Sequence, residues 1–441
     1  MADQLPLSDH ERSLLKAVED AREDLISLTQ ELVRIPTENV PPTGGELAAQ
    51  EFIRRWLGDA GVEAELIPLD DVPGLHEHEL FFRGEGYERR DYAGRPNLAA
   101  RLRGDPGGPR LILSGHIDTM PVGQTRWEHA PLGGEVTEGR LYGRGSFDMK
   151  AGVAASLMVV KTLRESRVPF AGEVIFETIV DEEHAGANGT LANRLAGYLG
   201  DAAIIPEPSN LHLYHAHKGF RIVHLTLRGK SGMSLGGEEL HNPVEHIGTL
   251  IEGFKVFRER RRRSAPIPAE YEHESDPTPV FMNKLQAGEF SLDIPMQVPE
   301  SCTLEVYWQT MPGETQQEVE SEFFEFLSEW MEAHPELNRF ALDHRFSHRW
   351  MPGTRTAREA PIVRTLEDAA ASVLGAPAPV VGAPYPCDMF VFSHFGIPSA
   401  IFGPRGGGGH GSDEYVEIDS LVQLTQVLTL AAVRFCRRAE E

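Results

Sequence analysis

Apolar residues recur at helical spacing in some parts of the chain and in short continuous runs in others. The helical spacing predicts helices over residues 14–33, 46–60 and 149–163. Ser8 and Glu11 form a capping-box pattern just before the first of these helices. The apolar runs predict strands at 98–102, 111–113, 174–180 and 202–205. Because strands alternate with helices, this part is predicted to be an α/β domain with a largely parallel sheet.

The pattern changes after residue 211 and returns near residue 336. In the middle, strands are predicted at 220–227 and 304–308 in an antiparallel sheet, with helices at 242–263 and 315–333. The final part predicts a helix at 365–374, a strand at 399–402 and a last helix at 421–438. We therefore expect a catalytic domain built from residues 1–212 and 336–441, interrupted by an inserted α+β domain over residues 213–335.

Composition narrows the class of protein. A chain of 441 residues is longer than one ordinary core organises. Its formal net charge of −25 disfavours nucleic acid and anionic membranes as partners. The simplest interpretation is that this charge keeps the protein soluble. Cys302, Cys387 and Cys436 are too few for a disulfide framework. The chain opens without a secretory-signal pattern and has no apolar run long enough to cross a bilayer, so a cytoplasmic location is expected.

Residues able to bind metal follow three of the predicted strands. His116 and Asp118 lie two positions apart after the strand at 111–113, so they share a face. Glu182 and Glu183 follow the next strand, where one can bind metal while the other moves protons. Glu207 follows an apolar run and is framed by prolines. Open α/β sheets place their sites at such strand ends.

Two further candidates lie beside glycine-rich stretches. Gly143 and Gly145 allow a close approach ahead of a helix and leave Asp148 at its start, and four glycines precede His410. Each segment alone has a plain structural explanation, since buried pairs, solvated glutamates and flexible glycine loops are common. Together they supply the mixed nitrogen and oxygen ligands that zinc accepts, and that cobalt or manganese can share.

These segments occur in the order found in a known superfamily. The chain resembles the dinuclear zinc metallopeptidases that include aminoacylase, carboxypeptidase G, acetylornithine deacetylase and succinyl-diaminopimelate desuccinylase. The resemblance covers nearly the whole chain. It implies a zinc-exopeptidase-like catalytic domain, an inserted lid, two divalent metal ions per chain and a small-molecule substrate. It further implies that Asp148 bridges the ions, while His116 and Glu207 complete one site and Glu183 and His410 complete the other.

The resemblance also assigns two residues to catalysis. Glu182 is implied to take a proton from the attacking water and carry it to the leaving nitrogen, and Asp118 to orient His116. The implied activity is hydrolysis of an amide-type C–N bond, as in N-acyl amino acid deacylases and dipeptidases. Two alternatives stay open: hydrolytic deamination of an aromatic amine, as by 5-nitroanthranilate aminohydrolase, and a non-catalytic metal-binding scaffold. The presence of Glu182 argues against the scaffold.

The lid departs from the superfamily's pattern. Met233, Met296 and Gln309 stand where relatives keep a histidine, an asparagine and an arginine, and all three are candidate substrate-binding residues. Gln309 cannot reproduce a bidentate Arg–carboxylate pair. His241 or His246 could supply the missing histidine. We therefore expect weak activity on ordinary N-acetyl amino acids and simple dipeptides, and a less anionic or aromatic substrate.

Two regions outside the ligand set also carry expectations. Dimeric relatives pair through the lid, so we expect a homodimer in which residues 242–257 and an edge strand meet across a two-fold axis. A monomer with a solvent-covered lid is the alternative. Residues 74–94 include Phe82, Tyr87 and Tyr92, and we interpret them as a surface loop rather than as a pocket wall.

Overall fold

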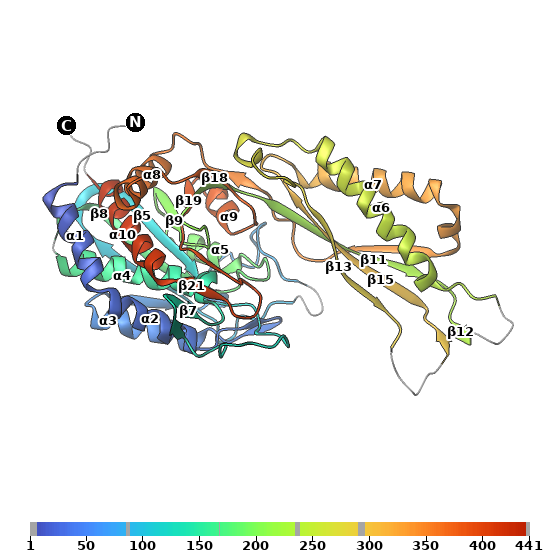
Figure 1. Cartoon of the computed structure of the whole chain (residues 1–441), viewed down its shortest axis with the longest axis horizontal. Coiled ribbons are helices and arrows are strands. Elements are labelled where there is room, and N and C mark those ends of the chain that lie inside the picture. The colour runs from blue at the N-terminus through green and yellow to red at the C-terminus, as the bar shows by residue number, and fades with distance from the viewer. Residues whose placement is uncertain (1–6, 85–88, 167, 234–238, 290–295, 438–441) are drawn as a thin grey trace. The chain divides into compact units, whose positions relative to one another are not determined.

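The computed structural model of the chain describes residues 7–84, 89–166, 168–233, 239–289 and 296–437 (Figure 1). The chain divides into two compact units. The first unit comprises Met1–Ala216, Arg355–Ala383 and Cys387–Glu441, and the second comprises His217–Thr354 and Pro384–Pro386. Residues 336–354, expected in the catalytic domain, instead lie in the second unit. The reason is that strand β16 (Ala341–Phe346) pairs there with β11 (Gly219–Arg228).

Helices pack around the first unit's sheet. Helix α1 (Asp9–Asp20) begins at the predicted capping box, where Ser8 and Glu11 exchange side-chain and backbone hydrogen bonds. The single helix predicted over 14–33 is wrong, because Ala21 leaves the helical conformation and α2 (Arg22–Arg34) begins separately after it. The other helices are α3 (Leu47–Asp59), α4 (Ala151–Ser166), α5 (Asn188–Leu195), α8 (Pro361–Leu374), α9 (Met389–His394) and α10 (Ile418–Phe435).

A mixed sheet forms the core of the first unit. Its centre is parallel and consists of neighbouring strands β19 (Ser399–Ile401), β9 (Ala202–Ile205), β5 (Asp105–His116) and β8 (Ala171–Ile179). Antiparallel strands flank this centre, namely β10 (Leu213–His217), β4 (Asn97–Arg103) and β3 (Ala64–Ile67). Helices α4 and α10 pack on each other and against β5 (Figure 1). Because parallel strands end at the same edge, the loops after the four central strands meet there.

The remaining strands of the structure are short. They are β1 (Asn39–Val40), β2 (Thr43–Gly44), β6 (Glu135–Thr137), β7 (Arg140–Tyr142), β12 (Gly232–Met233), β14 (Gln297–Val298), β17 (Thr354–Arg355), β18 (Val380–Ala383), β20 (Gly406–Gly407) and β21 (Tyr415–Glu417). Strand β21 joins β20 to β7, so the glycine-rich segment after β19 is tied to the segment that precedes Asp148. Among the described residues, no helix is long and apolar enough to cross a membrane.

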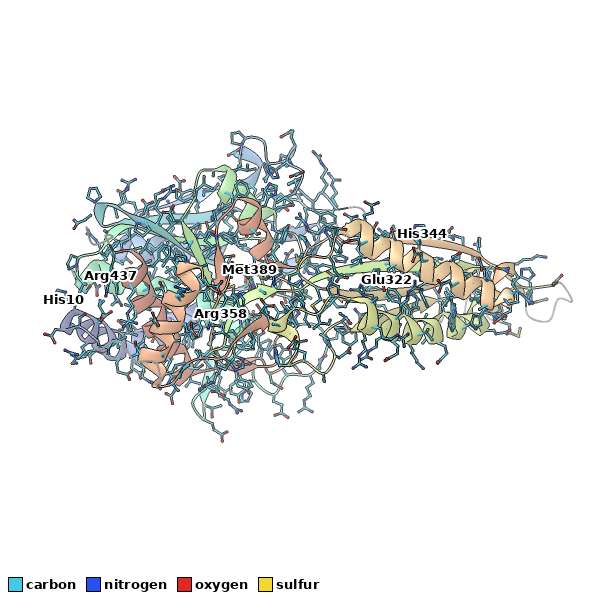
Figure 2. The ribbon with its side chains drawn as sticks, turned by 90° about the horizontal axis from the view of Figure 1, so that it is seen from above. His10, Glu322, His344, Arg358, Met389 and Arg437 are labelled. Carbon is cyan, nitrogen blue, oxygen red and sulfur yellow. The ribbon has the colours of Figure 1, made fainter. Side chains whose placement is uncertain are left out.

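The second unit is an antiparallel sheet in the order β13 (Val280–Ala287), β15 (Ser301–Thr310), β11, β16. Helices α6 (Pro243–Ser264) and α7 (Gln316–Ala333) lie along it (Figures 1 and 2). Between helices and sheet, Trp308 stacks on Phe323 and meets Phe257 edge-on. Buried Arg261 of α6 pairs with Glu322 of α7, which is labelled in Figure 2.

Candidate metal centre

The carboxyl edge of the parallel strands collects the candidate ligands. His116 is the last residue of β5, Glu182 and Glu183 follow β8, and Glu207 follows β9. Each of these strands is buried over its last residues, so its register in the sheet fixes where the following polar side chain emerges. The sequence placed these residues at strand ends, and the strand bounds confirm that placement.

Asp148 lies at the centre of the cluster. Its Oδ1 is 3.1 Å from Nε2 of His116, and its Oδ2 is 3.3 Å from Nε2 of His410. It is carried by an irregular helical turn, Ser146–Lys150, that leads into α4. The start of α4 lies tightly against the end of β9, where a Cβ on Gly152 would meet the carbonyl oxygen of Pro206 at 2.2 Å. This close approach brings Asp148 beside Glu207.

Three glutamates complete the cluster. Glu207 Oε1 is 3.3 Å from Nε2 of His116, and Glu183 Oε2 is 2.8 Å from Nε2 of His410. Glu182 Oε2 lies farther away, 4.0 Å from Nε2 of His116. Among the described residues, two overlapping sets of side chains are close enough to hold a metal ion: His116 with Glu182 and Glu207, and His116 with Asp148 and Glu183.

Hydrogen bonds fix the orientation of the buried imidazole. Nδ1 of His116 lies 2.9 Å from the carbonyl oxygen of Asp118, to which it can donate, so Nε2 keeps its lone pair toward the cluster. The carboxylate of Asp118 is 3.7 Å from the same nitrogen. That carboxylate accepts from the backbone N–H groups of Glu182 and Glu183 and from the amide of Asn39. Asp118 thus holds both the imidazole and the loop that carries the two glutamates.

Crowding of carboxylates raises their affinity for protons. Burial and the negative charge of Asp148 raise the pKa of Glu183 to about 7 and that of Glu207 to about 8. Burial raises the pKa of Glu182 well above its ordinary value. Burial opposes a charge on His410, yet contacts with Asp148 and Glu183 raise its pKa to about 11. The cluster concentrates negative charge in a buried place, which is the electrostatic setting of a cation site.

Glu414 supports the loop of Asp148, a role that the sequence did not predict. Its Oε1 accepts from the backbone N–H groups of Phe147 and Asp148, at 2.9 and 3.0 Å. Its Oε2 accepts from the backbone of Gly145 at 3.0 Å and from the guanidinium of Arg144 at 2.6 Å. Glu414 is fully buried. An acidic residue four positions after His410 was the available signal, but its backbone partners lie far away in the sequence.

The lid candidates lie in the second unit. Met233 of β12 pairs with Gln297 of β14, so Met233 and Met296 lie near each other. Both methionine side chains are exposed. The adjoining residues 234–238 and 290–295 fall outside the described part of the chain. Gln309 lies apart from them on β15, buried, and its amide donates to the carbonyl of Pro384 at 2.9 Å.

The two lid histidines share one aromatic neighbour. The ring of His246 lies 5.1 Å from that of Phe340, and the ring of His241 lies 6.2 Å from it. The backbone of His241 also pairs with Lys230. Within the second unit, therefore, both imidazoles pack on Phe340.

A family model agrees with this arrangement. Residues 112–434 match the model of peptidase family M20/M25/M40, a stretch that contains every candidate ligand. The chain is 25% identical to N-formyl-4-amino-5-aminomethyl-2-methylpyrimidine deformylase of Halalkalibacterium halodurans, over 96% of this chain and 97% of that protein.

Solved structures show the same fold. The dipeptidase Dug1p of Saccharomyces cerevisiae has a TM-score of 0.74 at 13% identity, over 98% of this chain and all of that one. The YXEP protein of Bacillus subtilis, a dinuclear metal-binding peptidase of the M20 family, has a TM-score of 0.61 at 18% identity, over 95% of this chain and 99% of that one. The chain belongs to peptidase family M20/M25/M40 and is a metal-dependent hydrolase that acts on amide-type C–N bonds.

Proposed function

We propose that this chain holds two divalent metal ions, most simply zinc, and uses them to hydrolyse the amide bond of a small N-acyl compound. The observation that carries the proposal is Asp148, whose two carboxylate oxygens each face a different imidazole. Each imidazole in turn faces a second carboxylate, Glu207 for His116 and Glu183 for His410. This set of donors fits two ions that share one carboxylate.

Chemistry at the centre divides between the ions and the protein. Bound ions would polarise the scissile carbonyl and make water more acidic. Glu182 is the proposed general base: it takes a proton from the attacking water and delivers it to the leaving nitrogen. Burial raises the pKa of Glu182 well above its ordinary value. Asp118 holds the backbone of Glu182 in place during both transfers.

The substrate class rests on two observations. The deformylase relative is named for an N-formyl aminomethylpyrimidine, a formamide that carries a heteroaromatic ring and no carboxylate. Gln309, at the place expected to hold a substrate carboxylate, is buried with its amide turned to Pro384. Both favour an uncharged or aromatic amine over an amino acid.

A substrate panel tests the proposal. Metal-loaded protein is incubated with N-formyl and N-acetyl aryl amines, N-acetyl amino acids, dipeptides and free aryl amines, and products are identified by mass spectrometry. We expect a carboxylic acid from the first group and weak activity on N-acetyl amino acids and dipeptides. Ammonia released from a free aryl amine would favour the deaminase instead, and no turnover of any compound would favour the scaffold.

We also propose a homodimer formed through the second unit. Strand β13 lies at the edge of its sheet and exposes about half of the side chains of Phe281 and Leu285. An exposed apolar edge strand is a surface that a second strand can cover. Light scattering of Phe281→Glu is the test, with Phe324→Glu on α7 as the matched control. A dimer mass for the control and a monomer mass for Phe281→Glu is expected, whereas a monomer mass for the unmodified protein would refute the dimer.

A further inference from the structure

The segment between η1 (Leu69–Asp71) and β4, residues 72–96, lies before the part of the chain that matches the family model. We call its described residues, 72–84 and 89–96, the strap. Its expected role as a surface loop is wrong for the part near residue 92, because Tyr92 is 4% exposed and Arg90 is 8% exposed. Phe82 is half-buried, and Tyr87 falls outside the described residues. The strap therefore packs into the first unit.

The strap's buried polar groups converge on Asp181, the residue before Glu182. The phenol of Tyr92 donates to Oδ2 of Asp181 at 2.6 Å, and Nε of Arg90 lies 2.9 Å from Oδ1. Both charged side chains of the pair are almost completely shielded from solvent, Arg90 at 1% and Asp181 at 0%. Burial and the charge of Asp181 raise the pKa of Tyr92 well above its ordinary value, so the phenol remains a donor.

The strap also holds the far end of the same loop. Asn188 accepts from the backbone N–H of Phe82 at 3.0 Å and donates to its carbonyl at 2.7 Å. The same amide donates to the Tyr92 hydroxyl at 2.6 Å. In the middle of the loop, the guanidinium of Arg90 donates to the carbonyl of His184 at 2.8 Å. The loop 181–188 is thus fastened to the strap at its start, middle and end.

This loop needs such support because its backbone is strained. Asp181, Ala185 and Ala187 have φ values of 65°, 56° and 53°, in the left-handed region that side chains other than glycine disfavour. Strained conformations persist where surrounding contacts determine them. The backbone hydrogen bond from Ala187 to the carbonyl of Asp181 closes the loop, but it does not fix the Asp181 side chain.

The loop carries Glu182 and Glu183, and one further residue links it to Asp118. The amide of Asn39 donates to Asp118 at 2.9 Å and to Asp181 at 3.3 Å. A displacement of Asp181 would therefore reach both the proposed base and the residue that holds its backbone. Of the proposed metal ligands, His116 at the end of β5 and Glu207 after β9 lie outside this loop, whereas Glu183 lies on it, so a displacement affects the base Glu182 and the ion on the His410 side.

We propose that Arg90 and Tyr92 are positioning residues: through Asp181 they set the loop that presents Glu182, so that the strap determines the turnover rate without touching the substrate. This inference rests on the proposed function for its catalytic part. The loop's dependence on the strap is a property of the folded protein alone and can be measured without any substrate.

The test uses the full chain with Tyr92→Phe, which removes one hydroxyl and keeps the ring. The matched control is Tyr198→Phe, since Tyr198 is buried in the same unit and its hydroxyl donates to Glu65, away from the loop. With both metal sites saturated, we expect kcat of Tyr92→Phe to fall roughly ten- to hundredfold, the size of one hydrogen bond to a charged group, with KM unchanged. The control should keep kcat within about twofold.

Hydrogen exchange on the metal-free protein provides the second readout. Backbone amides of residues 181–188 should exchange faster in Tyr92→Phe than in the unmodified chain or in Tyr198→Phe. Arg90→Lys keeps the charge but loses the fork that reaches both Asp181 and His184, and should show the same pattern. Unchanged exchange in both variants, or unchanged kcat alongside faster exchange, would overturn the positioning role. An unmodified protein inactive on the whole panel would instead refute the proposed function, and the exchange data would then decide whether the strap holds the loop.

Discussion

The two imidazoles that face Asp148 are held in different ways. His116 ends a buried strand, its side chain is 1% exposed, and its second nitrogen contacts the carbonyl of Asp118. The side chain of His410 is 52% exposed and follows a run of four glycines, with φ values of 74° at Gly408 and 60° at His410 itself. One side of the centre is built from the sheet, and the other is built from a loop.

This difference indicates that the His116 side of the centre is rigid, whereas the His410 side depends on contacts with neighbouring residues. Strand β5 pairs with β8 as far as His116 and with β9 as far as Leu113, and Glu207 follows the end of β9, so the sheet positions both residues. Before His410, Gly406 and Gly407 pair with β21, whereas Gly408 and Gly409 lie outside this ladder and lose more conformational freedom on ordering. The guanidinium of Arg144 reaches this loop by donating to the carbonyl of Gly411 at 3.0 Å. We therefore expect the His410 side to hold its ion more weakly.

The largest expected effect comes from Glu182, which lies on the loop after β8 and faces His116. Glu182→Gln keeps the size of the side chain but removes the proton acceptor, so kcat should fall by ~10²–10⁴-fold while metal content is unchanged. Steady-state kinetics with metal analysis by mass spectrometry checks this. Glu165→Gln, an exposed position at the end of α4, is the control. Normal turnover by Glu182→Gln would remove Glu182 from the mechanism.

The second prediction compares the two imidazoles directly. Metal analysis of the unmodified protein should give two ions per chain, and chelation should abolish activity. His410→Ala should keep one ion, because His116, Asp148 and Glu207 all remain on the sheet side. His116→Ala should bind metal more weakly than His410→Ala at both positions. It removes the buried imidazole and leaves the charge of Asp148 without that partner. Titration of the metal-free variants with zinc measures the metal affinity of each. Equal affinities would show that the two sides of the centre hold their ions equally well.

The third prediction concerns Glu414, which supports both sides of the centre. Glu414→Gln retains one acceptor oxygen in place of two, so it loses hydrogen bonds to the backbone around Asp148 or to Arg144. Residues that orient ligands in this way typically contribute ~10–100-fold to metal affinity. A zinc titration monitored alongside the melting temperature separates weaker binding from unfolding. Unchanged affinity would show that the glycine loop and Asp148 are held without Glu414.

The contrast between strand ends and loops also explains what could be predicted from the sequence. His116, Glu183 and Glu207 follow apolar runs, and the rule that sites lie at the carboxyl edge of a parallel sheet places them together. Glu414, Asn39 and the strap act through contacts between residues distant in sequence. Nothing local in Tyr92 indicates that its hydroxyl meets Asp181. Periodicity shows which residues are inside but not which buried polar groups pair.

The lid was the least predictable region, for a related reason. Strand β16 is largely exposed and polar, and only one of its edges joins the sheet. The sequence pattern therefore predicts the end of the inserted domain too early, near residue 336. Gln309 stays a candidate substrate-binding residue, and its place on the buried side of β15, where its amide donates to Pro384, could not be predicted from the sequence. Sequence alignment assigns a position to such residues, whereas packing decides the direction in which their side chains point.

The smallest expected effect extends the comparison to the lid imidazoles. His241 and His246 are the remaining candidates for the histidine that Met233 replaces, yet both rings pack on Phe340. His241→Ala and His246→Ala should each lose a ring contact worth about 0.5–1.5 kcal/mol of unfolding free energy, and kcat should stay within about twofold. Thermal unfolding and kinetics of each variant, with metal content as control, test this. A large fall in kcat for only one of them, with its metals retained, would identify that imidazole as the lid's hydrogen-bond donor. In that case ordinary N-acetyl amino acids would return as expected substrates, because the chemistry that Met233 cannot perform would have been restored from a neighbouring position.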